Sequence, residues 1–150
     1  MPRTDTASRL IAAPPGAVYR AFTDPGSLMA WLPPDGMTGR ALLFEPWEGG
    51  RYRIALTYTG EGEGKTDART DISAGRFLAL EPDRRIIMSV AFESDDPAIA
   101  GEMIMTWTFA PAPGGTEVAI TAEHVPAGIT AEDHAAGLAS SLDNLARFLG

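Results

Sequence analysis

Two tyrosines in one alternating segment are the residues whose type and spacing are best suited to chemistry. In residues 52–58 the even positions Tyr52, Ile54, Leu56 and Tyr58 are large and apolar, whereas the odd positions are mostly polar. Side chains two residues apart on a strand point to the same face, so both phenols are expected to face the interior. A buried hydroxyl needs a hydrogen-bond partner, either a polar ligand group or backbone. Tyr52 and Tyr58 are the clear inward-facing titratable groups, and hence the candidates for acid–base chemistry.

The other reactive residue types form no recognisable catalytic or metal-binding pattern. The chain has no cysteine, and His124 and His134 are separated by a predicted loop, so we expect no metal and no cofactor. Ser140 and Ser141 lie on a predicted helix without a neighbouring base, which argues against a nucleophile. The acidic, glycine-rich segment 61–67 lacks the ordered spacing of a calcium loop and is predicted as a hairpin tip. These patterns favour a protein that is not an enzyme, and an enzyme that uses inward-facing groups stays an open alternative.

Composition excludes several classes of partner. The 150 residues carry a net charge of −8, and Lys65 is the single lysine. A nucleic-acid or anionic membrane surface needs clustered basic side chains, so we expect neither partner. No apolar stretch is long enough for a signal peptide core or a membrane span, and we expect a single cytoplasmic domain over residues 1–150.

Hydrophobic spacing predicts an α+β protein. Residues 9–13 are expected to form a first strand, and two short helices follow, the second opened by Asp24 and Pro25. Clean alternation then predicts antiparallel strands with one buried face. Expected strands, including two weaker ones at 41–45 and 72–80, lie at residues 41–45, 52–58, 72–80, 86–92, 103–109 and 118–122.

A long amphipathic helix is predicted at the end of the chain. Thr130 can cap its first turn, and Leu138, Leu142, Leu145 and Leu149 form one apolar stripe. A helix with one apolar face must lie on the apolar face of the sheet. We therefore expect a curved antiparallel sheet of about six or seven strands wrapped around the C-terminal helix.

The residues facing this helix are the candidate ligand-binding residues. Two interpretations stay open, a solid core or an apolar cavity, and we favour a modest cavity. An unfilled cavity of about 300 Å³ would cost about 7 kcal/mol, so a real one must hold ligand or water. Trp31 and Trp47 are candidates for its entrance, with edge packing as the alternative. The full candidate set is Trp31, Trp47, Tyr52, Ile54, Leu56, Tyr58, Met88, Val90, Phe92, Met103, Met105, Trp107, Leu138 and Leu142.

Several local motifs, in order, resemble the START-like and Bet v1-like superfamily, and within it the bacterial single-domain branch of activator of Hsp90 ATPase homologues. They include Ile11-Ala12-Ala13-Pro14, residues 18–25, Gly49-Gly50-Arg51-Tyr52, Gly75-Arg76-Phe77, residues 80–86, Gly115-Thr116-Glu117-Val118 and residues 142–149. The resemblance spans nearly the whole chain and implies the helix-grip fold.

One departure from that family concerns the interior. Members usually carry Gly-Trp in the last helix, whereas this chain has Gly137-Leu138. The smaller side chain implies a larger or reshaped interior.

Three functions follow from the resemblance as expectations. The first is binding of a small hydrophobic or amphipathic molecule between the sheet and the helix. The second is a chaperone interaction of the Hsp90-activator kind, connected with stress response. The third is a cyclase- or hydrolase-like reaction in the same cavity. A homodimer is also compatible with the sequence.

Overall fold

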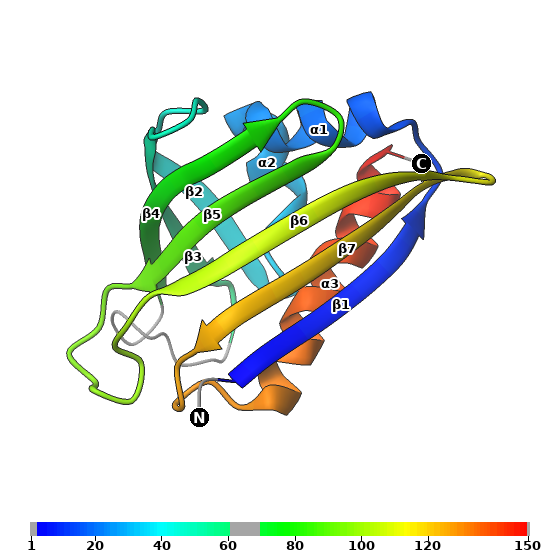
Figure 1. Cartoon of the computed structure of the whole chain (residues 1–150). Coiled ribbons are helices and arrows are strands. Elements are labelled where there is room, and N and C mark those ends of the chain that lie inside the picture. Colours follow the sequence, from blue (N-terminus) through cyan, green and yellow to red (C-terminus); the bar gives the residue numbers. More distant parts are fainter. Residues whose placement is uncertain (1–2, 61–69, 150) are drawn as a thin grey trace.

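A computed structural model describes residues 3–60 and 70–149, and the hairpin tip expected at 61–67 lies outside this part of the chain. The described residues form seven strands and three helices in the expected order (Figure 1). The strands are β1 (Arg3–Ile11), β2 (Met37–Phe44), β3 (Arg51–Tyr58), β4 (Thr70–Glu81), β5 (Arg85–Phe92), β6 (Met103–Ala112) and β7 (Gly115–Val125). The helices are α1 (Pro15–Thr23), α2 (Pro25–Trp31) and α3 (Ala131–Leu149).

All seven strands form one antiparallel sheet in the order β1-β7-β6-β5-β4-β3-β2. The sheet curves around α3, which confirms the helix-grip fold (Figure 1). β1 is longer than the strand expected at residues 9–13, because it pairs with β7 from Arg3 opposite Val125 to Ile11 opposite Thr116. Its polar first half forms a strand through this backbone pairing.

Side-chain caps begin two of the helices as expected. The Asp24 carboxylate accepts a hydrogen bond from the Ser27 amide at 2.9 Å, and Pro25 follows as the first residue of α2. The Thr130 hydroxyl accepts one from the Asp133 amide at 3.0 Å and caps α3. These local interactions fix where the helices start.

A solid aromatic core lies beneath α1 and α2. The rings of Phe22 and Trp31 meet edge-on at 5.1 Å between centroids, and Trp107 of β6 lies 4.6 Å from Phe22 and 5.8 Å from Trp31. The Trp31 indole donates a buried hydrogen bond to the Ala21 carbonyl oxygen at 3.0 Å. This end of the molecule is therefore closed by packed rings.

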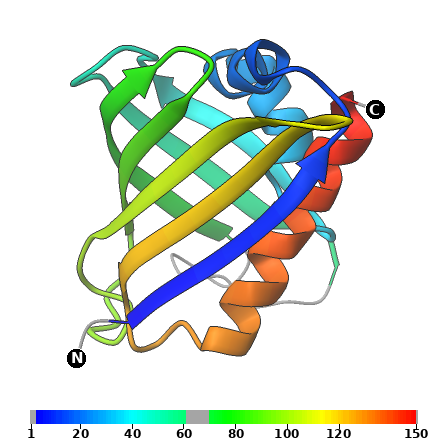
Figure 2. The same ribbon diagram turned by 45° about the vertical axis from the view of Figure 1, so that its right-hand side comes forward.

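Helix α3 packs along β1, at one edge of the sheet, and against α2 (Figure 2). Polar side chains fix its second half. Ser141 donates to the Leu32 carbonyl oxygen at 2.8 Å, and Asn144 donates to the Pro33 carbonyl oxygen at 2.9 Å. Both bonds satisfy carbonyls near the end of α2 that would otherwise lack partners. None of the helices in the described part of the chain is long and apolar enough to cross a membrane.

Candidate functional site

A cavity of about 850 Å³ lies between the sheet and α3. Its walls come from α1, α2, β2 to β6, the loops after α2, β5 and β7, and α3 as far as Ser141. Phe22, Leu28 and Trp107 close the end beneath α1 and α2. The volume falls within the range typical of small-molecule sites.

Ten of the fourteen candidate residues line this cavity. They come from β3, β5, β6 and α3, whose alternation or helical stripe placed them on the inward face. They are Tyr52, Ile54, Leu56, Tyr58, Met88, Val90, Phe92, Met105, Trp107 and Leu138. The register brings together residues far apart in sequence, since Met88 lies opposite Met105 and Ile86 opposite Trp107.

The other four candidates lie outside the cavity wall. Trp31 is fully buried in the aromatic core, where its N–H is bonded to backbone, so it lines no entrance. Trp47 is 58% exposed in the connection between β2 and β3 and does not reach the cavity. Met103 and Leu142 are buried in the core without lining the cavity, Leu142 because this half of α3 is held close to α2.

Several polar lining residues were missed by sequence reasoning. Asp71 and Ser73 of β4 line the cavity, and Asp71 is a buried carboxylate. Asp133 and His134, in the first turns of α3, also contribute to the wall. The sequence signal was weak for this part of β4, because its inward positions Asp71 and Ser73 are polar and alternation of apolar residues does not reveal them.

Tyr52 is held as a neutral hydrogen-bond donor. Its hydroxyl donates to the Ser89 carbonyl oxygen at 2.5 Å. Burial, and then the charge of Glu102, raise the pKa of the Tyr52 phenol far above its ordinary value. Gly75 of β4, which pairs with Tyr52, allows the Ser89 carbonyl to come this close. Any larger residue at position 75 would place its Cβ only 1.9 Å from the Ser89 carbonyl oxygen. This phenol is therefore poorly suited to act as a base.

A small ionic cluster joins the start of β1 to the start of α3. His134 Nδ1 lies 2.7 Å from the Asp5 carboxylate, and Arg3 Nε donates to Asp5 at 3.1 Å. Partial burial pushes the pKa of Asp5 upward, but the hydrogen bonds from His134 and Arg3 outweigh it and lower that pKa. Arg3 also donates to the Ile129 carbonyl oxygen, which ties the loop before α3 to the same cluster.

The indole N–H of Trp107 is a buried polar group in the described part of the chain. Trp107 is 2% exposed, and among the described residues no acceptor lies within hydrogen-bonding distance of its Nε1. Buried donors without acceptors are rare in native proteins.

Something must occupy the cavity in solution. The cavity is open to solvent on one side, so water enters it wherever no ligand is bound. Water or a ligand must therefore fill much of this space.

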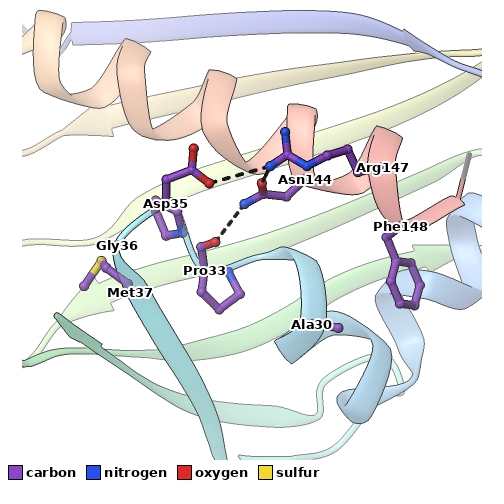
Figure 3. A pocket seen from close by; sticks show the side chains of 9 residues that line it. Ala30, Pro33, Asp35, Gly36, Met37, Asn144, Arg147 and Phe148 are labelled. Carbon is purple, nitrogen blue, oxygen red and sulfur yellow. Dashed lines mark hydrogen bonds and ion pairs between the residues drawn. The ribbon is translucent and has the colours of Figure 1, made fainter. Parts of the chain in front are cut away.

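A second, smaller pocket of about 440 Å³ lies between the loop before β2 and the end of α3 (Figure 3). Its polar groups bond mainly to one another. Asn144 donates to the Pro33 carbonyl oxygen, and Arg147 lies 3.6 Å from the Asp35 carboxylate and also bonds to Asn144 (Figure 3). These contacts fasten α3 to the preceding loop, so the larger cavity is the better candidate site.

No group of three or more metal-ligand side chains occurs among residues 3–60 and 70–149. His124 is exposed at the end of β7, and His134 is paired with Asp5. The two histidines are therefore not brought together in one cluster.

Comparison with known proteins finds one matching family and several similar structures that cover nearly the whole chain. Residues 12–150 match the model of the family described as activator of Hsp90 ATPase homolog 1-like protein. A crystal structure of a protein from Chromobacterium violaceum shares 33% identity, with a TM-score of 0.86 over 98% of this chain and 97% of that chain. A protein from Rhodobacter sphaeroides shares 26% identity, with a TM-score of 0.78 over 99% and 97% of the two chains. No curated protein matches this chain.

Proposed function

The chain belongs to the family of activator of Hsp90 ATPase homolog 1-like proteins, and on that premise we propose that it binds a small hydrophobic or amphipathic molecule without catalysing a reaction. The observation that carries the proposal is the cavity of about 850 Å³ between the sheet and α3, whose wall includes most of the inward apolar residues. Its two methionines, Met88 and Met105, suit a site that adapts to the shape of its ligand.

The proposal is tested on protein as purified and after refolding. Native mass spectrometry of the purified protein should show a bound small molecule. Refolded protein should bind the neutral fluorescent probe N-phenyl-1-naphthylamine, with one saturable site. If neither a bound mass nor saturable probe binding is found, the proposal fails.

A matched pair of variants locates the binding. Leu138→Trp adds bulk to the cavity wall and should weaken probe binding several-fold. Ala139→Trp places the same ring on the exposed face of α3, outside the cavity, and should leave binding unchanged. Both variants should unfold cooperatively, since residue 138 borders the cavity and residue 139 is exposed. Equal loss of binding in the two variants would show that the probe does not use the cavity.

An enzyme using the same cavity is the weaker alternative. The Tyr52 hydroxyl is bonded to Ser89 and its phenolate is disfavoured by burial, which leaves this group little scope for proton transfer. If Tyr52→Phe or Tyr58→Phe abolished turnover of any substrate while leaving its binding intact, the non-enzymatic proposal would be wrong.

A chaperone interaction is the second candidate function. The description of the family names an Hsp90 ATPase activator, and Trp47 offers a large apolar ring that is 58% exposed on the surface. Such rings are enriched at protein interfaces. Purified Hsp90 should then retain the protein in a pull-down, and Trp47→Ser should reduce the retained amount. The homodimer stays a prediction.

A further inference from the structure

Four cavity-lining residues that are exposed or half-buried lie on one face of α3. Asp133, Ala136, Gly137 and Ser140 all line the cavity and recur at the spacing i, i+3, i+4 and i+7. Asp133 and Ala136 are exposed, and Gly137 and Ser140 are half-buried. Because the two central residues of this face are small, the helix leaves space beside it at this level.

The opposite side of this space is formed by β2 and β3. Met37 and Tyr58 line the cavity there and are half-buried. α3 packs along β1, at the other edge of the sheet, and against α2 (Figure 2). We call the opening between Met37 and Tyr58 on one side and the α3 face formed by Asp133, Ala136, Gly137 and Ser140 on the other the α3 slot. Among the described residues, this slot gives a molecule in solvent a route into the cavity.

The charges at the α3 slot are negative. Asp35 and Asp133 are exposed and line the cavity, whereas no Arg or Lys is among its described lining residues. Arg147 lies 3.6 Å from Asp35, outside the cavity. The positive end of the α3 dipole already meets Glu132 and Asp133 in its first turn. An anionic head group would therefore find no counter-charge in the described wall.

Deeper in the cavity the wall is apolar apart from a few polar groups. Phe22, Leu28 and Val90 are buried there, whereas Asp71 and Ser73 of β4 add polar groups to the wall. The cavity thus suits an occupant that is mainly apolar and has a polar part.

We propose that the ligand is an amphiphile that enters through the α3 slot and leaves at that slot a head group without negative charge. Its apolar body occupies the cavity, and a cationic head is favoured over a neutral one by Asp133. This inference rests on the proposed binding function and adds to it the class of ligand and the place of its polar end.

The experiment compares three molecules that share a dodecyl chain and differ in their head group. Dodecyltrimethylammonium, 1-dodecanol and dodecanoate, each below its aggregation limit, compete with N-phenyl-1-naphthylamine for refolded protein at neutral pH and low ionic strength. The cation should displace the probe at about tenfold lower concentration than the anion, with the alcohol between them. Added salt should shrink the difference between cation and anion.

Two variants separate the slot from the overall charge of the protein. Asp133→Asn removes a carboxylate that lines the cavity, and it should reduce the cation-to-anion preference about threefold, the effect of one exposed charge. Glu132→Gln removes the same charge from the same helical turn, outside the cavity wall, and should leave the preference unchanged. Both substitutions are nearly isosteric and exposed, so both proteins should fold.

The experiment distinguishes failure of the slot proposal from failure of the proposed binding function. Dodecanoate competing as well as the cation, or Glu132→Gln acting as strongly as Asp133→Asn, would overturn the slot proposal. It would also be overturned if the probe bound and none of the three molecules displaced it. In each of these cases the binding function itself would stand, whereas failure of the probe to bind would remove the binding function instead.

Discussion

Leucines on the same stripe of α3 should respond differently to truncation, because only one of them faces the cavity. Leu138 lines the cavity and is 6% exposed, whereas Leu145 is fully buried in the solid core. Leu138→Ala and Leu145→Ala remove the same atoms and create the same residue in the same helix. Helix propensity is therefore matched, and the comparison isolates packing.

The expected magnitudes follow from what surrounds each side chain. Removing three buried carbons loses roughly 2 kcal/mol of transfer free energy at about 0.8 kcal/mol per methylene. At Leu145 a new void adds to this, so a loss of about 4 kcal/mol is expected. At Leu138 the removed carbons already adjoin open space that water or ligand can enter, so the loss should be about 1–2 kcal/mol.

The assay is urea unfolding followed by tryptophan fluorescence, on protein refolded to remove any bound molecule. With a slope of about 2 kcal/mol per M, the midpoint should fall by about 2 M for Leu145→Ala and by less than about 1 M for Leu138→Ala. Leu142→Ala provides a further comparison, because Leu142 was expected at the cavity but lies in the core. It should behave like Leu145→Ala.

Equal losses at Leu138 and Leu145 would refute the reasoning. They would mean that the interior around Leu138 is packed in solution as tightly as the core, and that the cavity does not persist. A change in the slope for one variant alone would call for a different explanation, since it reports altered surface exposure on unfolding.

Three further outcomes are expected in the same unfolding assay. Trp31→Phe should lose about 2–3 kcal/mol, because it removes a buried hydrogen bond and ring atoms from the core, whereas Trp47→Phe on the exposed turn should change stability by less than about 0.5 kcal/mol. Gly75→Ala should lose more than about 2 kcal/mol because its Cβ would collide with backbone, whereas Gly137→Ala, with open space around it in a helix, should gain up to about 1 kcal/mol. Asp5→Asn should be less stable than the natural chain at pH 7, and this difference should shrink as the pH falls below about 3.8, because the lowered pKa of Asp5 stabilises the fold only while the carboxylate is ionised.

Local patterns in the sequence were sufficient for most of the fold. The period of two in β3, β5 and β6 predicted their inward faces, because a strand's geometry assigns alternate residues to opposite faces. Asp24 and Thr130 predicted the starts of α2 and α3, since a cap acts on amides within three residues. The family resemblance is confirmed by the match over residues 12–150.

Elements that depend on distant partners were predicted less well. The first half of β1 has no alternating apolar pattern of its own and becomes a strand through pairing with β7. In β4 the inward Asp71 and Ser73 are polar, so the pattern did not reveal that this strand contributes to the cavity wall. His134 lines the wall and pairs with Asp5, and a contact between residues so far apart in sequence is not visible in a local pattern.

The sequence by itself determined which side chains face inward, because strand and helix periodicity are local properties of the backbone. Only the tertiary structure decided which of these side chains pack against other core residues and which border the cavity. That depends on the separation between α3 and the sheet, and this separation is set by the packing of α3 along β1 and by its bonds to Leu32 and Pro33. Leu138 and Leu142 thus carry the same side chain on the same stripe, and the position of the helix places one at the cavity and the other in the core.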